Sequence, residues 1–258
     1  MEKIRISAVR YANTYPFIWG LRESGFEKKV TIEIDHPSGC AEKLISGKAD
    51  IGLVPVAALP RLKSYNIAAD YCIGANGNVR TVMLFTNGPF TGVKKIYLDY
   101  RSMTSVNLTR VLAGKMWKRE FEWSNTSEEF GFLNIAEDEA VVLIGDQCTA
   151  SESFFNTGID LAGEWKKYTG LPFVFAVWAS TRELDKSFRD EFNNALKLGV
   201  DNLGKVSDAF AGISVFSRTD LEDYLRKNID FSLDGRKIEA LELFLKMLAD
   251  LGKNEGSH

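Results

Sequence analysis

The chain has little cysteine and histidine. Only three of its 258 residues are cysteines and two are histidines. The cysteines Cys40, Cys72 and Cys148 are odd in number and form no CxxC pair, so the sequence predicts neither a disulfide framework nor a zinc site. His36 is the only internal histidine, which removes any histidine-rich metal site. We therefore expect reduced thiols and a cytoplasmic protein.

Several familiar motifs and sequence features are also missing. No GxGxxG follows a predicted strand, and neither GxxxxGK[ST] nor HExxH occurs, so we expect no cofactor and no metal. The net charge of -3 lacks the basic excess of a nucleic-acid surface. No apolar run is long enough for a membrane span. Residues 1–11 alternate charged and apolar side chains without the apolar core of a signal peptide, so we expect no export.

The sequence that is present is typical of a soluble α/β protein. Hydrophobic residues make up 45% and charged residues 26% of the chain, which is long enough for one large or two modest domains. Strands predicted at residues 4–8, 30–35 and 50–54 alternate with helices that begin near Thr14 and Ser38. Such alternation favours a mostly parallel sheet in each half of the chain.

The stretch GLPFVFAVWAS, residues 170–180, organises the rest of the chain. Its unbroken apolar run predicts a strand covered on both faces. We interpret it as the point where the chain, after leaving a first domain, returns to that domain's sheet.

The outward crossing is predicted near residues 86–89, a cluster of structure-breaking residues. Just before it, Asn76-Gly77-Asn78 separates two strand-like runs and predicts a hairpin or a turn. We therefore expect a discontinuous first domain of residues 1–87 and 178–258, an inserted second domain of residues 88–177, and a ligand cleft between them.

Three turns carry small polar residues that suit an anionic ligand: residues 11–14, 76–81 and 102–105. Backbone N–H groups and the positive dipole at a helix start bind anions. Equally, Thr14, Ser102 and Thr104 can simply cap helices. Asn13 follows the first strand, where open α/β sheets place ligands, but asparagine is also common in turns.

The motifs VRYANTYPFIWGL, KLISGKADIGLVPV, SMTSVNL, VVLIGDQ and TGLPFVFAVWA together resemble the chorismate dehydratases of the futalosine route to menaquinone. The resemblance runs from about Ile4 to Ala179. It implies the two-domain fold of type II periplasmic binding proteins. It also implies a cytoplasmic hydro-lyase that converts chorismate to 3-[(1-carboxyvinyl)oxy]benzoate, with no nucleic-acid or membrane partner.

By this resemblance we predict that Asn13 and Thr81 are catalytic. The predicted substrate-binding residues come from the matched motifs and their neighbours: Tyr11, Arg80, Ser102, Thr104, Ser105, Gly145 and Asp146.

Two of the matched motifs depart from the family pattern. A DGPVRS-like stretch reads NGNVRT here, and an SRTS loop reads SMTS, with Met103 in place of arginine. Either Arg101 or Arg80 is then the candidate cation.

Alternatives to the dehydratase remain open at this stage. A cytoplasmic solute-binding module for a small carboxylate would also explain a cleft and the lost arginine. Dihydroxynaphthoate synthase, of the same pathway, shares the implied fold. An exported receptor would need a signal peptide or a lipid-anchored cysteine.

Overall fold

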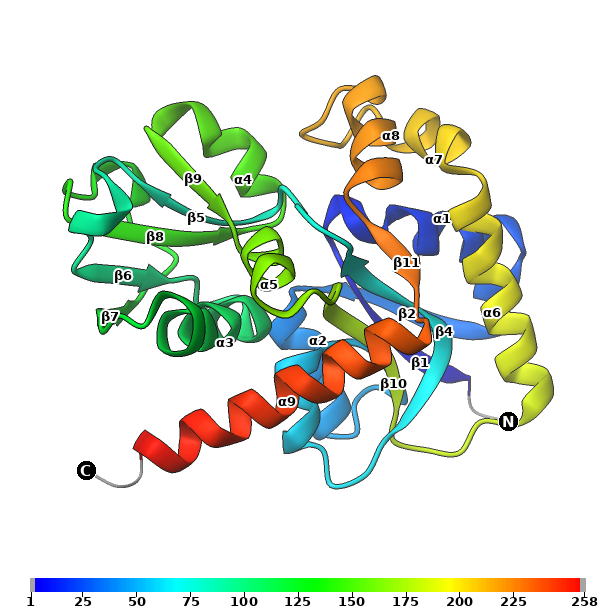
Figure 1. Ribbon diagram of the computed structural model, residues 1–258. Helices are drawn as coiled ribbons and strands as arrows, with labels where there is room; N and C mark the ends of the chain where they lie inside the picture. The colour runs from blue at the N-terminus through cyan, green and yellow to red at the C-terminus, as the bar shows by residue number, and fades with distance from the viewer. Residues whose placement is uncertain (1–2, 256–258) are drawn as a thin grey trace. The chain divides into compact units, whose positions relative to one another are not determined.

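The computed structural model describes residues 3–255, with side chains described through Lys253. The chain forms two compact units, residues 3–74 with 174–235 and residues 75–173 with 236–255, and each unit contains one sheet (Figure 1). Residues 75–87, which the sequence-based division assigns to the first domain, supply a strand to the second sheet. The C-terminal helix likewise belongs to the second unit.

The first unit contains a six-stranded mixed sheet. Its strands lie in the order β11-β4-β10-β3-β1-β2. They are β1 (Ile4–Val9), β2 (Val30–Asp35), β3 (Ile51–Pro55), β4 (Asn66–Ala75), β10 (Phe173–Ser180) and β11 (Asp230–Ser232). Strand β1 is parallel to β2 and β3, whereas β10 is antiparallel to β3 and β11 to β4. The expectation of a mostly parallel sheet is therefore wrong, because the returning strand β10 enters in the opposite direction.

Strand β10 is buried along its whole length, as its sequence predicts. On one face the Trp178 ring packs against Phe17 of α1 and Phe192 of α6, with ring centroids 5.8 and 5.2 Å apart. On the opposite face of the sheet, Gly52 of β3 leaves room for the backbone of Cys40 in α2. The first-unit helices are α1 (Tyr15–Glu23), α2 (Pro37–Ile45), α6 (Lys186–Asp201), α7 (Leu203–Phe210) and α8 (Arg218–Lys227).

Helix α2 begins two residues earlier than a helix capped by Ser38 would. His36 occupies the N-cap position and Pro37 the first turn, so Ser38, expected as the cap, is itself helical. Pro37 suits this place because a proline lacks the N–H that would be unpaired there.

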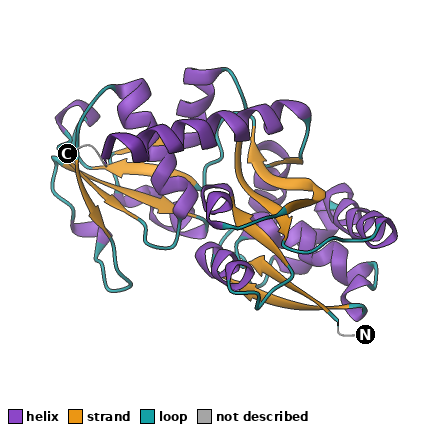
Figure 2. Ribbon diagram, turned by 90° about the horizontal axis from the view of Figure 1, so that it is seen from below, coloured by secondary structure: helices purple, strands orange, loops and turns teal. Residues whose placement is uncertain are grey.

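The second unit contains a five-stranded mixed sheet in the order β7-β6-β8-β5-β9. Its strands are β5 (Val82–Thr86), β6 (Lys95–Leu98), β7 (Glu122–Asn125), β8 (Glu139–Ile144) and β9 (Thr157–Asp160). Its helices are α3 (Met103–Leu112), α4 (Asp146–Ser151), α5 (Leu161–Thr169) and α9 (Gly235–Glu255). Figure 2 shows helices packed against the strands.

Of the two alternatives predicted around Asn76-Gly77-Asn78, a hairpin or a turn, the hairpin is wrong. Strand β4 belongs to the first sheet and β5 to the second. Both neighbouring positions of β4 are occupied, by β11 and β10, and β5 pairs instead with β8 and β9. The turn is therefore where the chain passes from one unit to the other.

Helix α9 packs on the second unit through aromatic contacts. The Phe244 ring lies edge-on to Phe173 and Trp165, at centroid distances of 5.1 and 6.1 Å. Although α9 spans 21 residues, none of the helices in the described part of the chain is long and apolar enough to cross a membrane.

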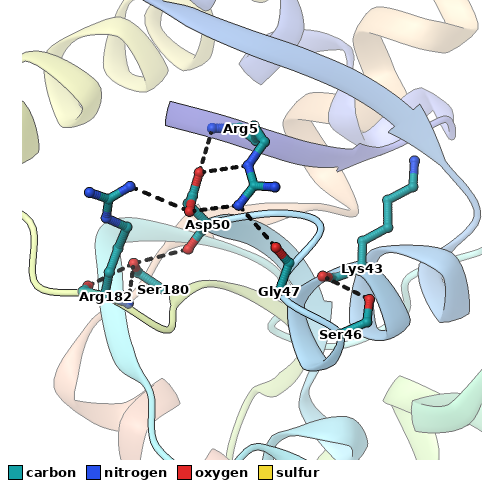
Figure 3. Close-up of polar contacts among 7 residues, drawn as sticks. All are labelled: Arg5, Lys43, Ser46, Gly47, Asp50, Ser180 and Arg182. Atoms are coloured by element: carbon teal, nitrogen blue, oxygen red, sulfur yellow. Dashed lines mark hydrogen bonds and ion pairs between the residues drawn. The ribbon is translucent and has the colours of Figure 1, made fainter. Parts of the chain in front are cut away.

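Asp50 joins three strands of the first sheet (Figure 3). Its carboxylate accepts hydrogen bonds from the Arg5 backbone N–H at 2.9 Å and from the Arg5 guanidinium at 3.1 Å. Its carbonyl oxygen accepts the Ser180 hydroxyl at 3.1 Å, and Arg182 lies 3.4 Å from the carboxylate. Burial tends to raise the pKa of Asp50, but the hydrogen bonds and charge of Arg5, with the charge of Arg182, hold it below 3.8.

We expect Asp50→Asn to lower the free energy of unfolding at pH 7 by about 1 to 3 kcal/mol, since hydrogen bonds to a charged group are lost. Because the folded-state pKa is lowered, this stabilisation is present above the unfolded pKa and disappears as the pH falls through the folded pKa. Urea denaturation of both proteins at pH 7 and at about pH 3 measures the difference.

Asp208→Asn is the control, because Asp208 forms an exposed ion pair with Arg218 and such pairs contribute little. A loss for Asp50→Asn that is equally large at both pH values would contradict the account.

Candidate functional site

Three polar segments lie together at one end of the strands of the second sheet. Strands β6 and β8 are parallel and β5 is antiparallel to β8, so the ends of β6 and β8 lie beside the start of β5. Thr81 precedes β5, residues 102–105 follow β6, and Gly145 and Asp146 follow β8. We call these segments the strand-end cluster. The structure thus brings together the site residues that the sequence predicts in this unit.

A backbone hydrogen bond joins Thr81 to Gly145. The Gly145 N–H donates to the Thr81 carbonyl oxygen at 2.8 Å. Gly145 has φ 61° and ψ -146°, a backbone conformation essentially restricted to glycine. This conformation turns the chain directly from β8 into α4. Thr81 itself is buried, with 2% of its surface exposed.

The start of α3 supplies the hydroxyl groups of the cluster. Ser102 is the N-cap residue, and its hydroxyl accepts the Ser105 N–H at 3.2 Å. The interpretation of Ser102 as a cap is therefore confirmed. Thr104 and Ser105 lie buried in the first turn, where the positive end of the helix dipole favours negative charge.

The guanidinium group of Arg101 is bound by other side chains of the protein. Its Nε and Nη2 atoms donate to the two oxygens of Asp99 at 2.9 and 2.5 Å, and Nη2 also donates to Gln147 of α4. Asp99 is buried, so it compensates the Arg101 charge. These bonds tie the segment after β6 to the start of α4, and they pair the Arg101 charge with Asp99.

Arg80 lies on the β9 side of the strand-end cluster, whereas Arg101 lies on the β6 side. Its side chain is exposed, and its backbone is left-handed with φ 64°. It lines a groove of about 350 Å³ together with Met83, Asp160, Glu164 and Lys167, among others. The lining includes neither the first turn of α3 nor Gly145 and Asp146, so this groove and the start of α3 are separate features of the second unit.

In the first unit, Tyr11 and Asn13 follow β1. Asn13 lies in a 3-10 turn, Ala12–Thr14, and the Thr14 N–H donates to the Tyr11 carbonyl oxygen at 2.9 Å. The Thr14 hydroxyl donates to Asn13 Oδ1 at 3.3 Å rather than capping α1. The Asn13 side chain therefore has an oxygen that accepts from Thr14 and an NH₂ group that can donate to a ligand.

Burial makes the cysteines poor nucleophiles. It raises the pKa of the Cys40 thiol to about 12 and raises that of Cys148 as well, which disfavours the reactive thiolate. Among the residues that the structure describes, no group of three or more His, Cys, Asp or Glu side chains is arranged to hold a metal ion.

Sequence reasoning missed two side chains that hold the cluster in place. Gln147 binds Arg101, and Asp160 accepts the Arg80 N–H at 2.7 Å. Asp160 ends β9, a four-residue edge strand that contains a glycine and was not predicted. The available signal was an aspartate just before the helical pattern of α5, which is typical of an N-cap.

Solved structures define the class of fold. Protein AF1704 from Archaeoglobus fulgidus superposes with a TM-score of 0.77 and 15% identity, over 97% of this chain and 98% of that one. A Candida albicans protein described as having the generic periplasmic binding protein fold gives a TM-score of 0.68 with 11% identity, over 97% and 91% of the two chains. This chain therefore has the periplasmic-binding-protein-like fold, as the resemblance implied.

The sequence comparisons define the family. A family model described as menaquinone biosynthesis matches residues 4–250, so the chain belongs to this menaquinone biosynthesis family. The match includes the helical C-terminal part, beyond the Ala179 limit of the recognised motifs. A chorismate dehydratase of Thermus thermophilus is 28% identical over 227 residues, which are 78% of this chain and 79% of that protein.

We expect Gly145→Ala to lower the free energy of unfolding by about 1 to 3 kcal/mol, because a side chain strains the backbone at φ 61°. Gly212→Ala is the control, since its added methyl group meets nothing within 4 Å. Urea denaturation measures both variants. Equal, small effects would contradict the conformation assigned to Gly145.

Proposed function

We propose that the chain is a chorismate dehydratase, which removes water from chorismate to give 3-[(1-carboxyvinyl)oxy]benzoate. The observation that carries the proposal is the match of residues 4–250 to the menaquinone biosynthesis family, together with the 28% identical chorismate dehydratase. The strand-end cluster adds a chemical reason, since hydroxyl groups at a helix start suit a carboxylate substrate. The cytoplasmic location expected from the sequence stays a prediction.

The reaction is an elimination driven by aromatisation. Chorismate carries a ring carboxylate, an enolpyruvyl ether at C3 and a hydroxyl at C4. The C3–H bond breaks, its electron pair forms the C3–C4 double bond, and the C4 hydroxyl leaves with a proton as water. The C3 proton is acidified through the ring double bond conjugated with the carboxylate, so donors placed where negative charge accumulates lower the barrier.

The predicted site residues are assigned complementary roles. The ring carboxylate is bound by the hydroxyl and backbone groups of Ser102, Thr104 and Ser105, aided by the dipole of α3. Thr81 and the NH₂ group of Asn13 orient the leaving hydroxyl or the enolpyruvyl arm. Tyr11, Arg80, Gly145 and Asp146 complete the proposed substrate contacts.

The proton acceptor is assigned to the substrate. Glutamate and aspartate are absent from the predicted catalytic pair, and Asp99 is bound to Arg101. We assign the role to the enolpyruvyl carboxylate of chorismate, held next to the C3 proton. Holding this arm away from the ring carbons also suppresses the competing rearrangement to prephenate, because orientation alone controls which reaction proceeds.

Product analysis tests the proposed function. Substoichiometric protein is mixed with chorismate, and the mixture is followed by chromatography and mass spectrometry. We expect a new aromatic product lighter by one water, formed over many turnovers. Tight chorismate binding without turnover would instead indicate a solute-binding module. An aromatic product formed only from a cyclic futalosine compound would indicate a dihydroxynaphthoate synthase.

We expect Asn13→Ala to lower kcat for chorismate by roughly 100-fold or more, since removal of one donor to developing charge costs that much. Steady-state kinetics of folded variants measure the effect. Asn134→Ala, at an exposed position of the 3-10 turn Phe132–Asn134 in the second unit, is the control and should keep the wild-type rate. Full turnover by Asn13→Ala would remove Asn13 from its assigned role.

At Thr81, the hydroxyl group and the shape of the side chain can be separated. Thr81→Ser retains the hydroxyl and should keep kcat within about threefold, whereas Thr81→Val retains the shape and should lose roughly 10- to 100-fold. The same kinetics measure both. If serine and valine reduced kcat equally, the hydroxyl would have no part in the reaction.

A further inference from the structure

Both carboxylate oxygens of Asp160 accept hydrogen bonds from backbone N–H groups. It caps α5, with Oδ1 accepting the Gly163 N–H at 3.0 Å. An N-cap residue needs only one such bond. The second oxygen, Oδ2, accepts the backbone N–H of Arg80 at 2.7 Å. Asp160 therefore connects the start of α5 to a turn eighty residues earlier in the chain.

That turn has a strained backbone. Arg80 has φ 64°, a left-handed conformation that costs a residue with a side chain about 1 to 2 kcal/mol. It persists only where the surroundings hold it. Arg80 directly precedes Thr81, whose carbonyl oxygen accepts the Gly145 N–H. The direction in which the chain enters Thr81 is therefore set by the Arg80 turn.

The preceding residues of the loop rest on the same helix. Lys166 Nζ donates to Asn76 Oδ1 at 2.8 Å. Asn78 Oδ1 lies so near Gly163 that a Cβ added there would be 2.2 Å from it. Asp160, Gly163 and Lys166 are three residues apart, so they share one side of α5.

We propose that Asp160 is a positioning residue, which fixes the Thr81 hydroxyl for the reaction by binding the Arg80 backbone. The inference rests on the proposed function for the role of Thr81. It goes beyond that function because Asp160 is assigned no contact with the substrate and acts through the Arg80 main chain. Lys166, six residues further along the chain, supports the same loop by binding Asn76.

The surroundings of Asp160 are consistent with a dedicated anchor. Burial raises the pKa of the Asp160 carboxyl, and backbone N–H groups of Gly163, Arg80, Val79 and Ala162 partly offset this. A carboxylate that only capped a helix at the surface would not carry this desolvation cost.

A double-mutant cycle tests the proposal. We expect Asp160→Asn, which keeps one acceptor oxygen, to lower kcat for chorismate roughly 10- to 100-fold with KM changed by less than about threefold, because small misplacements impair the chemical step. In a Thr81→Val background the same substitution should change kcat by no more than about twofold, because the hydroxyl that it positions is already gone. Independent, multiplicative losses would overturn the proposal.

The matched control is Asp185→Asn. Asp185 caps α6 by accepting the Phe188 N–H at 2.8 Å, and it makes the same kind of local bond without a distant partner. We expect kcat to be unchanged. Lys166→Met, at the surface, provides a second variant that does not threaten folding. It should lower kcat about threefold to tenfold in the wild-type background only.

Amide hydrogen exchange tests the positioning role of Asp160 independently of the proposed function. Asp160→Asn should accelerate amide exchange at residues 79–81 at least about tenfold, and Asp185→Asn should not. If the wild-type protein does not turn over chorismate, the proposed function fails while exchange still decides whether Asp160 holds the turn. Unchanged exchange at residues 79–81 in Asp160→Asn would overturn the positioning role.

Discussion

Burial of β10 on both faces is the constraint on which the rest of the structure depends. Its apolar side chains are stable only between layers, and in the first sheet β10 lies between β4 and β3. Strand β4 ends at Ala75 and β10 begins at Phe173, so neighbouring strands enclose almost one hundred residues of sequence. Those residues have to complete a sheet and core of their own, which is the second unit.

Local patterns in the sequence predict the fold wherever the pattern is long. The apolar run of β10 and the alternating residues of β1 identify their strands, and Gly47, with φ 70°, follows the end of α2, where glycine is typical of a helix C-terminus. The short strands β7, β9 and β11, of four, four and three residues, escape prediction because so few side chains show no periodicity. The supposed hairpin fails for another reason: turn residues show that a chain turns, not which strand it pairs with next.

The features of the site also divide into those that local sequence predicts and those that it does not. The cap at Ser102 is predictable because its partner is three residues away. The bonds of Arg101 to Gln147 and of Asp160 to Arg80 join residues 46 and 80 positions apart, and no local pattern encodes them. The catalytic roles of Asn13 and Thr81 come from family resemblance. Local pattern alone leaves Asn13 as either a ligand-binding or a turn residue and places Thr81 in a polar turn. Near Thr81 the structure adds physical support: a glycine-only turn at Gly145, the Arg101 charge compensated by Asp99, and the Asp160 carboxylate with both oxygens bound.

The most direct measurement for the account as a whole is a crystal structure of the Asn13→Ala variant with chorismate, which this variant is expected to retain unreacted. The account predicts that the ring carboxylate lies within hydrogen-bonding distance of the first turn of α3, at Ser102, Thr104 or Ser105. Chorismate ordered instead in the groove beside Arg80 and Lys167, with the start of α3 unoccupied, would contradict it.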